Sequence, residues 1–315
     1  MDYRNYKLLD ARIDARFEAR DFQAALGLID HGLEAFPERS VELEAYRLAC
    51  HREQGHLERC LELMDEGLAA GRFYSIYWKS WDVIRSLPGY AELDRRNRGN
   101  RDRAQVESLP CFQVVTPPGH DASRPHPLAI VLHGDGNGCH LDTMVHEWSA
   151  GPYLRRGFVV CYMQSSRVEC TGGFGWTRDY GRSRSEIHGM MRKVAEQCRI
   201  DERCVVLGGF SGGAMASVDL LFDGGLPLKG VIALCPASTG SEKPETLARA
   251  AAVGTRVVLL EGELSGQVED QVALADLLRE AGIAQAFLRN PGIGHAIPAD
   301  MDARLEEALD FILHP

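Results

Sequence analysis

From Pro110 onward, the chain alternates short apolar runs with longer amphipathic stretches. The apolar runs are rich in β-branched residues, and apolar positions in the stretches between them recur every three or four residues. This alternation is typical of βαβ units, in which helices cover both faces of a parallel sheet. The predicted strands are Phe112–Val115, Leu128–Leu132, Phe158–Met163, Cys204–Gly208, Gly230–Leu234, Arg256–Glu261 and Ala284–Arg289; the predicted helices are Arg182–Cys198, Gly212–Phe222, Pro244–Ala252, Gln267–Ala281 and Met301–Leu313.

The N-terminal third contains an internal repeat instead. The stretches DFQAALGLIDHGLEA, from Asp21, and HLERCLELMDEGLAA, from His56, share six identical positions at an offset of 35 residues. Apolar positions 25, 26, 29 and 33 have the spacing of an amphipathic helix. Each unit therefore predicts two antiparallel helices, with a break near Asp21 in the first unit and near His56 in the second.

This repeat resembles tetratricopeptide repeats, whose unit is a helical hairpin of similar length. The resemblance implies a small all-α repeat domain within residues 1–105, to which residues 73–93 add a third helical layer. Two interpretations stay open: a groove that binds a peptide or protein partner, and a structural appendage. The arginine-rich segment 94–103 (DRRNRGNRDR) is interpreted as a solvated linker, so the second domain is expected to span residues 106–315.

The strongest chemical signal is the pentapeptide GFSGG at residues 209–213. It matches the pattern Gly-x-Ser-x-Gly and lies between a predicted strand and a predicted helix, which is the setting of a nucleophile elbow. Glycines allow the tight turn, and the turn places the Ser211 hydroxyl at a helix N-terminus. Ser211 is therefore the candidate nucleophile.

A serine hydroxyl needs a base, because it is hardly ionised at neutral pH. His295 lies between the last predicted strand and the last predicted helix, where the base of such an elbow is expected. Gly292 and Gly294 flank it and allow the backbone to turn sharply. His295 is the candidate base.

A third element is the loop HGDGNG at residues 133–138, directly after a predicted strand. Its glycines free backbone N–H groups, so the N–H of Asp135 or Gly136 is expected to bind the oxyanion together with that of Gly212. His133 is interpreted as a structural residue of the loop. The DGNG sequence resembles the opening of an EF-hand, but the twelfth position is a histidine, so no metal is predicted.

Composition narrows the class of protein. Among 315 residues, 35 are Lys or Arg and 45 are Asp or Glu, for a formal net charge of −10. An acidic surface argues against binding to nucleic acid or anionic membranes. The apolar runs are far shorter than a membrane span, and the first residues lack the pattern of a secretory signal. The nine cysteines are scattered without regular spacing, which is typical of reduced thiols in a cytosolic protein. The sequence predicts a cytoplasmic protein.

Residues 108–315 resemble the α/β-hydrolase superfamily, and within it the phospholipase/carboxylesterase branch that includes acyl-protein thioesterases. The likeness lies in VLGGFSGGAMAS around Ser211, LKGVIALCPAS from Leu228, and GIGH ending at His295. It implies a mostly parallel sheet with helices on both faces, catalysis by Ser211 and His295, and oxyanion donors at Gly212 and Asp135. It also implies hydrolysis of carboxylic esters or thioesters without a cofactor.

The acid of the catalytic triad departs from this resemblance. The position where the family has an aspartate is Ser265 in the sequence VVLLEGELSGQVED. Glu263 is the predicted substitute because it has a longer side chain on the same loop. Glu261, Glu269 and Asp270 are the alternatives.

These residues together predict a serine hydrolase that acts on small-molecule or acyl esters through an acyl-enzyme intermediate. Two other functions stay open. One is a non-catalytic scaffold that binds a peptide partner through the helical repeats, and the other is a peptidase of the same fold.

Overall fold

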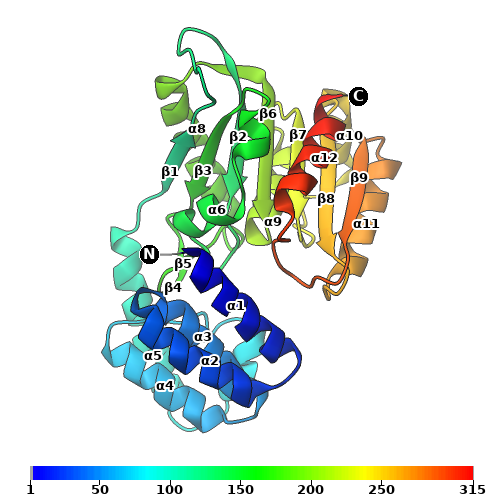
Figure 1. The fold of residues 1–315 in the computed structure, drawn as a ribbon. Coiled ribbons are helices and arrows are strands. Elements are labelled where there is room, and N and C mark those ends of the chain that lie inside the picture. The colour runs from blue at the N-terminus through cyan, green and yellow to red at the C-terminus, as the bar shows by residue number, and fades with distance from the viewer. Residues whose placement is uncertain (1–2, 315) are drawn as a thin grey trace. The chain divides into compact units, whose positions relative to one another are not determined.

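The computed structural model describes residues 3–314 and consists of two compact units (Figure 1). The first unit comprises the chain up to Ser108 together with Gly136–Gly138 and Val168–Gly173. The second comprises Leu109–Asp135, Cys139–Arg167 and the chain from Phe174 onward. Two short segments that follow residue 106 in the sequence thus pack with the N-terminal unit.

Successive helices of the first unit pack on one another, as expected of helical hairpins. Ile13, Ala25, Ile29 and Leu43 are fully buried between them. Asp21 caps the second helix by accepting a hydrogen bond from Ala24 N. The elements are α1 (Tyr3–Glu18), α2 (Phe22–Ala35), the 3₁₀ helix η1 (Pro37–Arg39), α3 (Ser40–Glu53), α4 (Leu57–Ala69), the 3₁₀ helix η2 (Lys79–Ile84) and α5 (Tyr90–Glu107). The likeness to tetratricopeptide repeats stays a prediction.

The interpretation of residues 94–103 as a solvated linker is wrong, because these residues lie inside α5. Two asparagines of this segment are buried and bind the backbone of the preceding loop. Asn97 accepts a hydrogen bond from Tyr74 N and donates one to Tyr74 O. Asn100 donates to Leu68 O and Arg72 O. These long-range bonds anchor one face of a helix whose other faces carry the arginines.

The second unit is built on a seven-stranded sheet with the order β1-β3-β2-β6-β7-β8-β9. All neighbouring strands are parallel except β1 and β3, which are antiparallel. The strands are β1 (Cys111–Val115), β2 (His126–Leu132), β3 (Val159–Gln164), β6 (Ile200–Phe210), β7 (Gly230–Leu234), β8 (Arg256–Gly262) and β9 (Gln285–Asn290); a separate two-stranded sheet pairs β4 (Val168–Cys170) with β5 (Gly173–Phe174).

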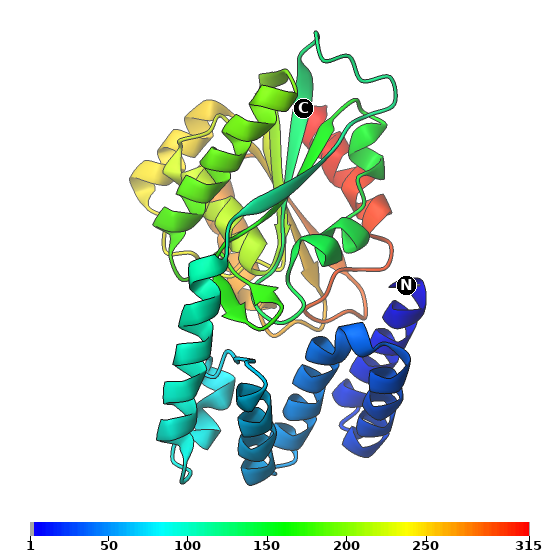
Figure 2. The ribbon, with the colours of Figure 1, turned by 90° about the vertical axis from the view of Figure 1, so that its left-hand side faces the viewer.

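Helices cover both faces of the large sheet (Figure 2). Alternate residues of β2 show this division: Leu128, Ile130 and Leu132 belong to one buried cluster, whereas Ala129 and Val131 belong to the other. The first face packs against α8 (Tyr180–Gln197), α9 (Gly212–Asp223), α10 (Pro244–Val253) and α11 (Val268–Glu280); the second packs against α6 (Leu141–Glu147), α7 (Gly151–Leu154) and α12 (Met301–Leu313). This is the α/β-hydrolase arrangement that the sequence predicts.

None of the helices within residues 3–314 is both long and apolar enough to cross a lipid bilayer.

The close packing of β6, α9 and β2 gives a stability prediction. A Cβ atom on Gly213 would lie 2.4 Å from the carbonyl oxygens of Leu132 and His133, which are backbone atoms and cannot move aside. Gly213→Ala is therefore expected to lower the free energy of unfolding by about 3 kcal/mol or more, measured by urea denaturation. Gly266→Ala is the control, because no atom lies within 4 Å of its added Cβ. An equal loss in both variants would contradict this explanation.

Candidate active site

Ser211 lies at the sharp turn between β6 and α9, at the carboxyl end of a central strand. Its backbone has φ 51° and ψ −115°, a conformation that residues with a side chain rarely adopt. Hydrogen bonds hold it there: Ser211 N donates to Leu234 O at 2.8 Å, and Ser211 O accepts from Met215 N at 2.9 Å. Neighbouring strand and helix thus fix the direction of the serine side chain.

His295 reaches this serine from the loop after β9. Its Nε2 lies 2.9 Å from Ser211 Oγ, although 84 residues separate the two in sequence. The imidazole also packs against the Phe210 ring, with 5.1 Å between the centroids. Although the His295 side chain is exposed in part, desolvation by its neighbours lowers its pKa below the ordinary value of 6.5, and the charge of Glu261 opposes this effect. At neutral pH the ring is therefore unprotonated and can accept the serine proton.

Backbone contacts hold the histidine loop on the end of β8. Leu264 N donates to Ile293 O at 2.9 Å. A Cβ on Gly262 would lie 2.0 Å from Gly294 O, so only glycine permits this approach. The position of His295 therefore depends on the end of β8 and on the residues that follow it.

The acidic candidates occupy different environments. The Glu263 side chain is exposed, and its Oε2 accepts a hydrogen bond from Gly292 N at 3.0 Å, so it binds the backbone of the histidine loop. Glu261, by contrast, is fully buried at the end of β8. Its Oε1 accepts from Gly262 N at 2.9 Å, and its Oε2 has no hydrogen-bond partner within residues 3–314. Glu261 is the carboxylate whose charge acts on His295.

The other acidic candidates lie apart from this arrangement. Glu269 and Asp270 are exposed in the first turn of α11. Ser265, at the family's aspartate position, is buried and accepts a hydrogen bond from Gln267 N at 3.3 Å. It caps the chain entering α11 and carries no charge.

Cys235, at the end of β7, is a residue that the sequence reasoning missed. It is buried and has a φ of 55°, another strained conformation. Its thiol lies close enough to the Glu261 carboxylate for that charge to act on it. Burial, the strongest influence, and the charge of Glu261 raise the pKa of the Cys235 thiol, so the thiol stays protonated. The one signal in the sequence for Cys235 is its position directly after a predicted strand, Gly230–Leu234.

Asp135 lies beside the elbow, and the structure brings it together with Gly212. A Cβ on Gly212 would lie 2.0 Å from Asp135 Oδ1, so the carboxylate packs directly against this glycine. Asp135 accepts hydrogen bonds from Trp176 N at 2.8 Å, Thr177 N at 3.2 Å and Thr177 Oγ1 at 2.6 Å. Gly136 has a φ of 101° and belongs to the first unit.

His133 is fully enclosed behind this loop. Its Nδ1 donates to Gly134 O at 2.5 Å, and its Nε2 accepts from Ser165 N at 3.2 Å. Burial lowers its pKa to about 4, so it stays neutral. The ring stacks on Trp176, which is itself fully buried and donates through Nε1 to His133 O. Both residues therefore support the loop that carries Asp135.

In the part of the chain that the structure describes, no group of three or more histidine, cysteine, aspartate or glutamate side chains is arranged to hold a metal ion.

Comparison with known proteins shows the fold. No protein-family model and no curated protein sequence matches the chain. Among solved structures, an uncharacterized protein from Bacillus cereus ATCC 10987 aligns over 98% of both chains, with 19% identity and a TM-score of 0.54. Esterase PE8 aligns with 65% of this chain and 99% of its own, with 21% identity and a TM-score of 0.50. A ferulic acid esterase aligns with 66% of this chain and 93% of its own, with 12% identity and a TM-score of 0.52.

Proposed function

We propose that this protein is a serine hydrolase that cleaves carboxylic esters or thioesters through an acyl-enzyme intermediate. The observation that carries the proposal is the 2.9 Å contact between His295 Nε2 and Ser211 Oγ at a strained strand–helix turn. Two proteins of similar fold bear the name esterase, which agrees with this proposal.

In this mechanism His295 removes the proton of Ser211 as the serine oxygen attacks the substrate carbonyl. The histidine then returns the proton to the leaving alcohol or thiol. A water molecule, activated by the same histidine, attacks the acyl-enzyme and releases the carboxylic acid. The lowered pKa of His295 suits this cycle, because the free base predominates at neutral pH.

The negative oxygen of the tetrahedral intermediate needs hydrogen-bond donors. Gly212 N is the first, because it begins α9 directly after the nucleophile and lies at the positive end of the helix dipole. The backbone N–H of Asp135 or of Gly136 is proposed as the second. The contact of the Asp135 side chain with Gly212 places this loop beside the elbow, which supports a donor from the loop.

For the acid we propose Glu261, the alternative on β8, in preference to the first-choice Glu263. The buried Oε2 of Glu261 lacks a hydrogen-bond partner among the described residues, and a buried carboxylate oxygen in that state is costly. An imidazolium at His295 would relieve that cost. Glu263 then acts as a positioning residue, because it binds Gly292 N in the histidine loop.

Turnover of short p-nitrophenyl esters and of thioesters with the same acyl groups tests this function. The chain is expected to hydrolyse at least one of them, and His295→Ala is expected to lose this activity. Absence of turnover at every acyl length, in a folded chain, would favour the scaffold that binds a peptide partner through the helical repeats. Cleavage of amide substrates alone would favour a peptidase. A cytoplasmic location remains a prediction.

The pKa of His295 predicts the pH dependence of this activity. His295 acts only as the free base, so kcat/KM falls as the pH decreases through its pKa in the free enzyme. Because desolvation lowers that pKa, the midpoint of the decline is expected below pH 6.5. A pH series of kcat/KM with a p-nitrophenyl ester measures the midpoint. A midpoint above pH 6.5 would contradict the environment described for this histidine.

A further inference from the structure

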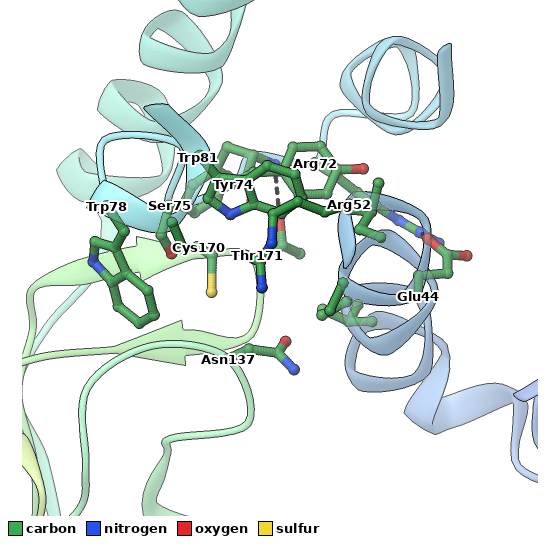
Figure 3. Close-up of a pocket in the computed structure, with 16 residues that line it drawn as sticks. Glu44, Arg52, Arg72, Tyr74, Ser75, Trp78, Trp81, Asn137, Cys170 and Thr171 are labelled. Atoms are coloured by element: carbon green, nitrogen blue, oxygen red, sulfur yellow. Dashed lines mark hydrogen bonds and ion pairs between the residues drawn. The ribbon is translucent and has the colours of Figure 1, made fainter. Parts of the chain in front are cut away.

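A cavity of about 310 Å³ lies within the first unit, formed by residues from four parts of the sequence (Figure 3). One wall is α3, another is the segment from Arg72 to Trp81, and the third consists of Asn137, Cys170 and Thr171. The volume is within the range of small-molecule sites.

Hydrogen bonds and packing fix these walls. Phe73 N donates to Thr171 Oγ1 at 2.8 Å, and Thr171 N donates to Phe73 O at 3.0 Å. The Trp78 ring packs against Gly136, where an added Cβ would lie 2.3 Å from it. These two walls of the cavity are therefore joined to each other.

The two ends of the cavity differ in character. Figure 3 shows Trp78 at one end and Glu44 with Arg72 at the other, with Cys170 and Thr171 between them. Trp78 is 40% exposed, which is unusual for so large an apolar side chain and leaves its ring available to a ligand. A matching ligand has an apolar, flat body and a polar head.

The charges indicate the sign of that head. The charged side chains in the lining are Glu44, Arg52 and Arg72, and Arg52 forms an ion pair with Glu53, which lies outside the lining. Arg72 forms an ion pair with Glu44 through Nη1, which leaves other N–H donors of the same guanidinium. Arg52 lies over the Trp81 ring, 4.9 Å from its centroid, and so occupies the face that a ligand cation would need. A carboxylate fits this end better than an ammonium group.

We propose that this cavity binds a small carboxylic acid with a flat apolar body, whose carboxylate is held by Arg72 and whose body lies against Trp78. The identity of the ligand rests on the proposed function, because ester hydrolysis releases a carboxylic acid of this class. The cavity, whose lining does not include Ser211 or His295, is thus a second site that binds carboxylic acids, the class of product that ester hydrolysis releases.

Calorimetric titration of the full chain carrying Ser211→Ala tests this proposal with 2-naphthoate as the probe. The matched neutral and cationic probes are 2-naphthylmethanol and 2-naphthylmethylammonium. We expect 2-naphthoate to bind at least tenfold more tightly than either, with the same affinity as in the chain that retains Ser211. Absence of 2-naphthoate binding, or equal affinity for the three probes, would overturn the proposal.

Two variants separate the role of Arg72 as a ligand contact from its role in the ion pair. Both Arg72→Gln and Glu44→Gln remove the ion pair, but only the first removes the positive charge. Arg72→Gln is expected to weaken 2-naphthoate binding at least tenfold, whereas Glu44→Gln should strengthen it, because the competing carboxylate is gone. Weaker binding in both variants would contradict the assignment. Loss of ester turnover would count against the proposed function, whereas loss of 2-naphthoate binding counts against this site.

Discussion

Replacing Ser211 with alanine is expected to lower kcat/KM for ester hydrolysis by about 10⁵- to 10⁶-fold. The variant removes only the hydroxyl oxygen that lies 2.9 Å from His295 Nε2, and the backbone bonds of the turn do not involve it. The melting temperature should therefore remain close to that of the original chain. Steady-state kinetics with the best p-nitrophenyl ester, together with thermal unfolding, measure the two effects.

Ser217→Ala provides a matched control on the same helix. Ser217 is fully buried, lies six residues after the nucleophile, and donates through Oγ to Gly213 O at 2.8 Å. Its loss is expected to cost about 1 kcal/mol of stability and to change kcat/KM only a few-fold. If Ser217→Ala and Ser211→Ala lost activity equally, damage to the helix rather than loss of a nucleophile would explain both.

Replacing Glu261 with glutamine is expected to give the second largest loss, about 10²- to 10⁴-fold in kcat/KM. The neutral amide no longer stabilises the imidazolium that forms during the reaction. Because the charge of Glu261 raises the pKa of His295, its removal should lower that pKa further. The acid limb of the pH profile should therefore move to lower pH while the plateau falls.

Glu263→Gln is the matched control for this loop. The Glu263 side chain is exposed, and a glutamine can still accept the hydrogen bond from Gly292 N. We expect kcat/KM to change by less than about threefold, which corresponds to under 1 kcal/mol, with the acid limb unmoved. A large loss and a shifted limb in Glu263→Gln, without either effect in Glu261→Gln, would identify Glu263 as the acid.

The central sheet could be predicted because its strands are buried on both faces. Continuous apolar runs such as Gly230–Leu234 coincide with β7, and the predicted helix Met301–Leu313 coincides with α12. Helices α6 and α7 could not be predicted, because elements of seven and four residues are too short to show a periodic pattern. The strands β4 and β5 were missed for the same reason.

Long-range contacts explain the incorrect interpretation of residues 94–103. Their composition is that of a solvated segment, but Asn97 and Asn100 bind backbone groups of residues 68–74. No local pattern shows that two asparagines about one helical turn apart will bind backbone groups of another segment. Hydrogen bonds to distant parts of the chain thus stabilise this segment as a packed helix.

The candidate site, too, could be predicted only in part from the sequence. Glycines around Ser211 and His295 signalled both positions, because tight turns need them. The choice among the acids depends on where β8 ends: Glu261 is still in the strand and buried, whereas Glu263 is beyond it and exposed. The predicted strand Arg256–Glu261 places this boundary to within one residue, but the sequence does not show that the Glu261 side chain is buried. Nor does it show that the charge of Glu261 acts on the Cys235 thiol.

Mass spectrometry of the chain after reaction with a fluorophosphonate tests the central claim most directly. This reagent attaches covalently to a serine only when a neighbouring base activates it. We predict one adduct per chain, located on Ser211 by peptide mapping and formed much more slowly when His295 is replaced by alanine. An adduct on another residue, or none in a folded chain that hydrolyses esters, would contradict the assignment of Ser211 and His295 as nucleophile and base.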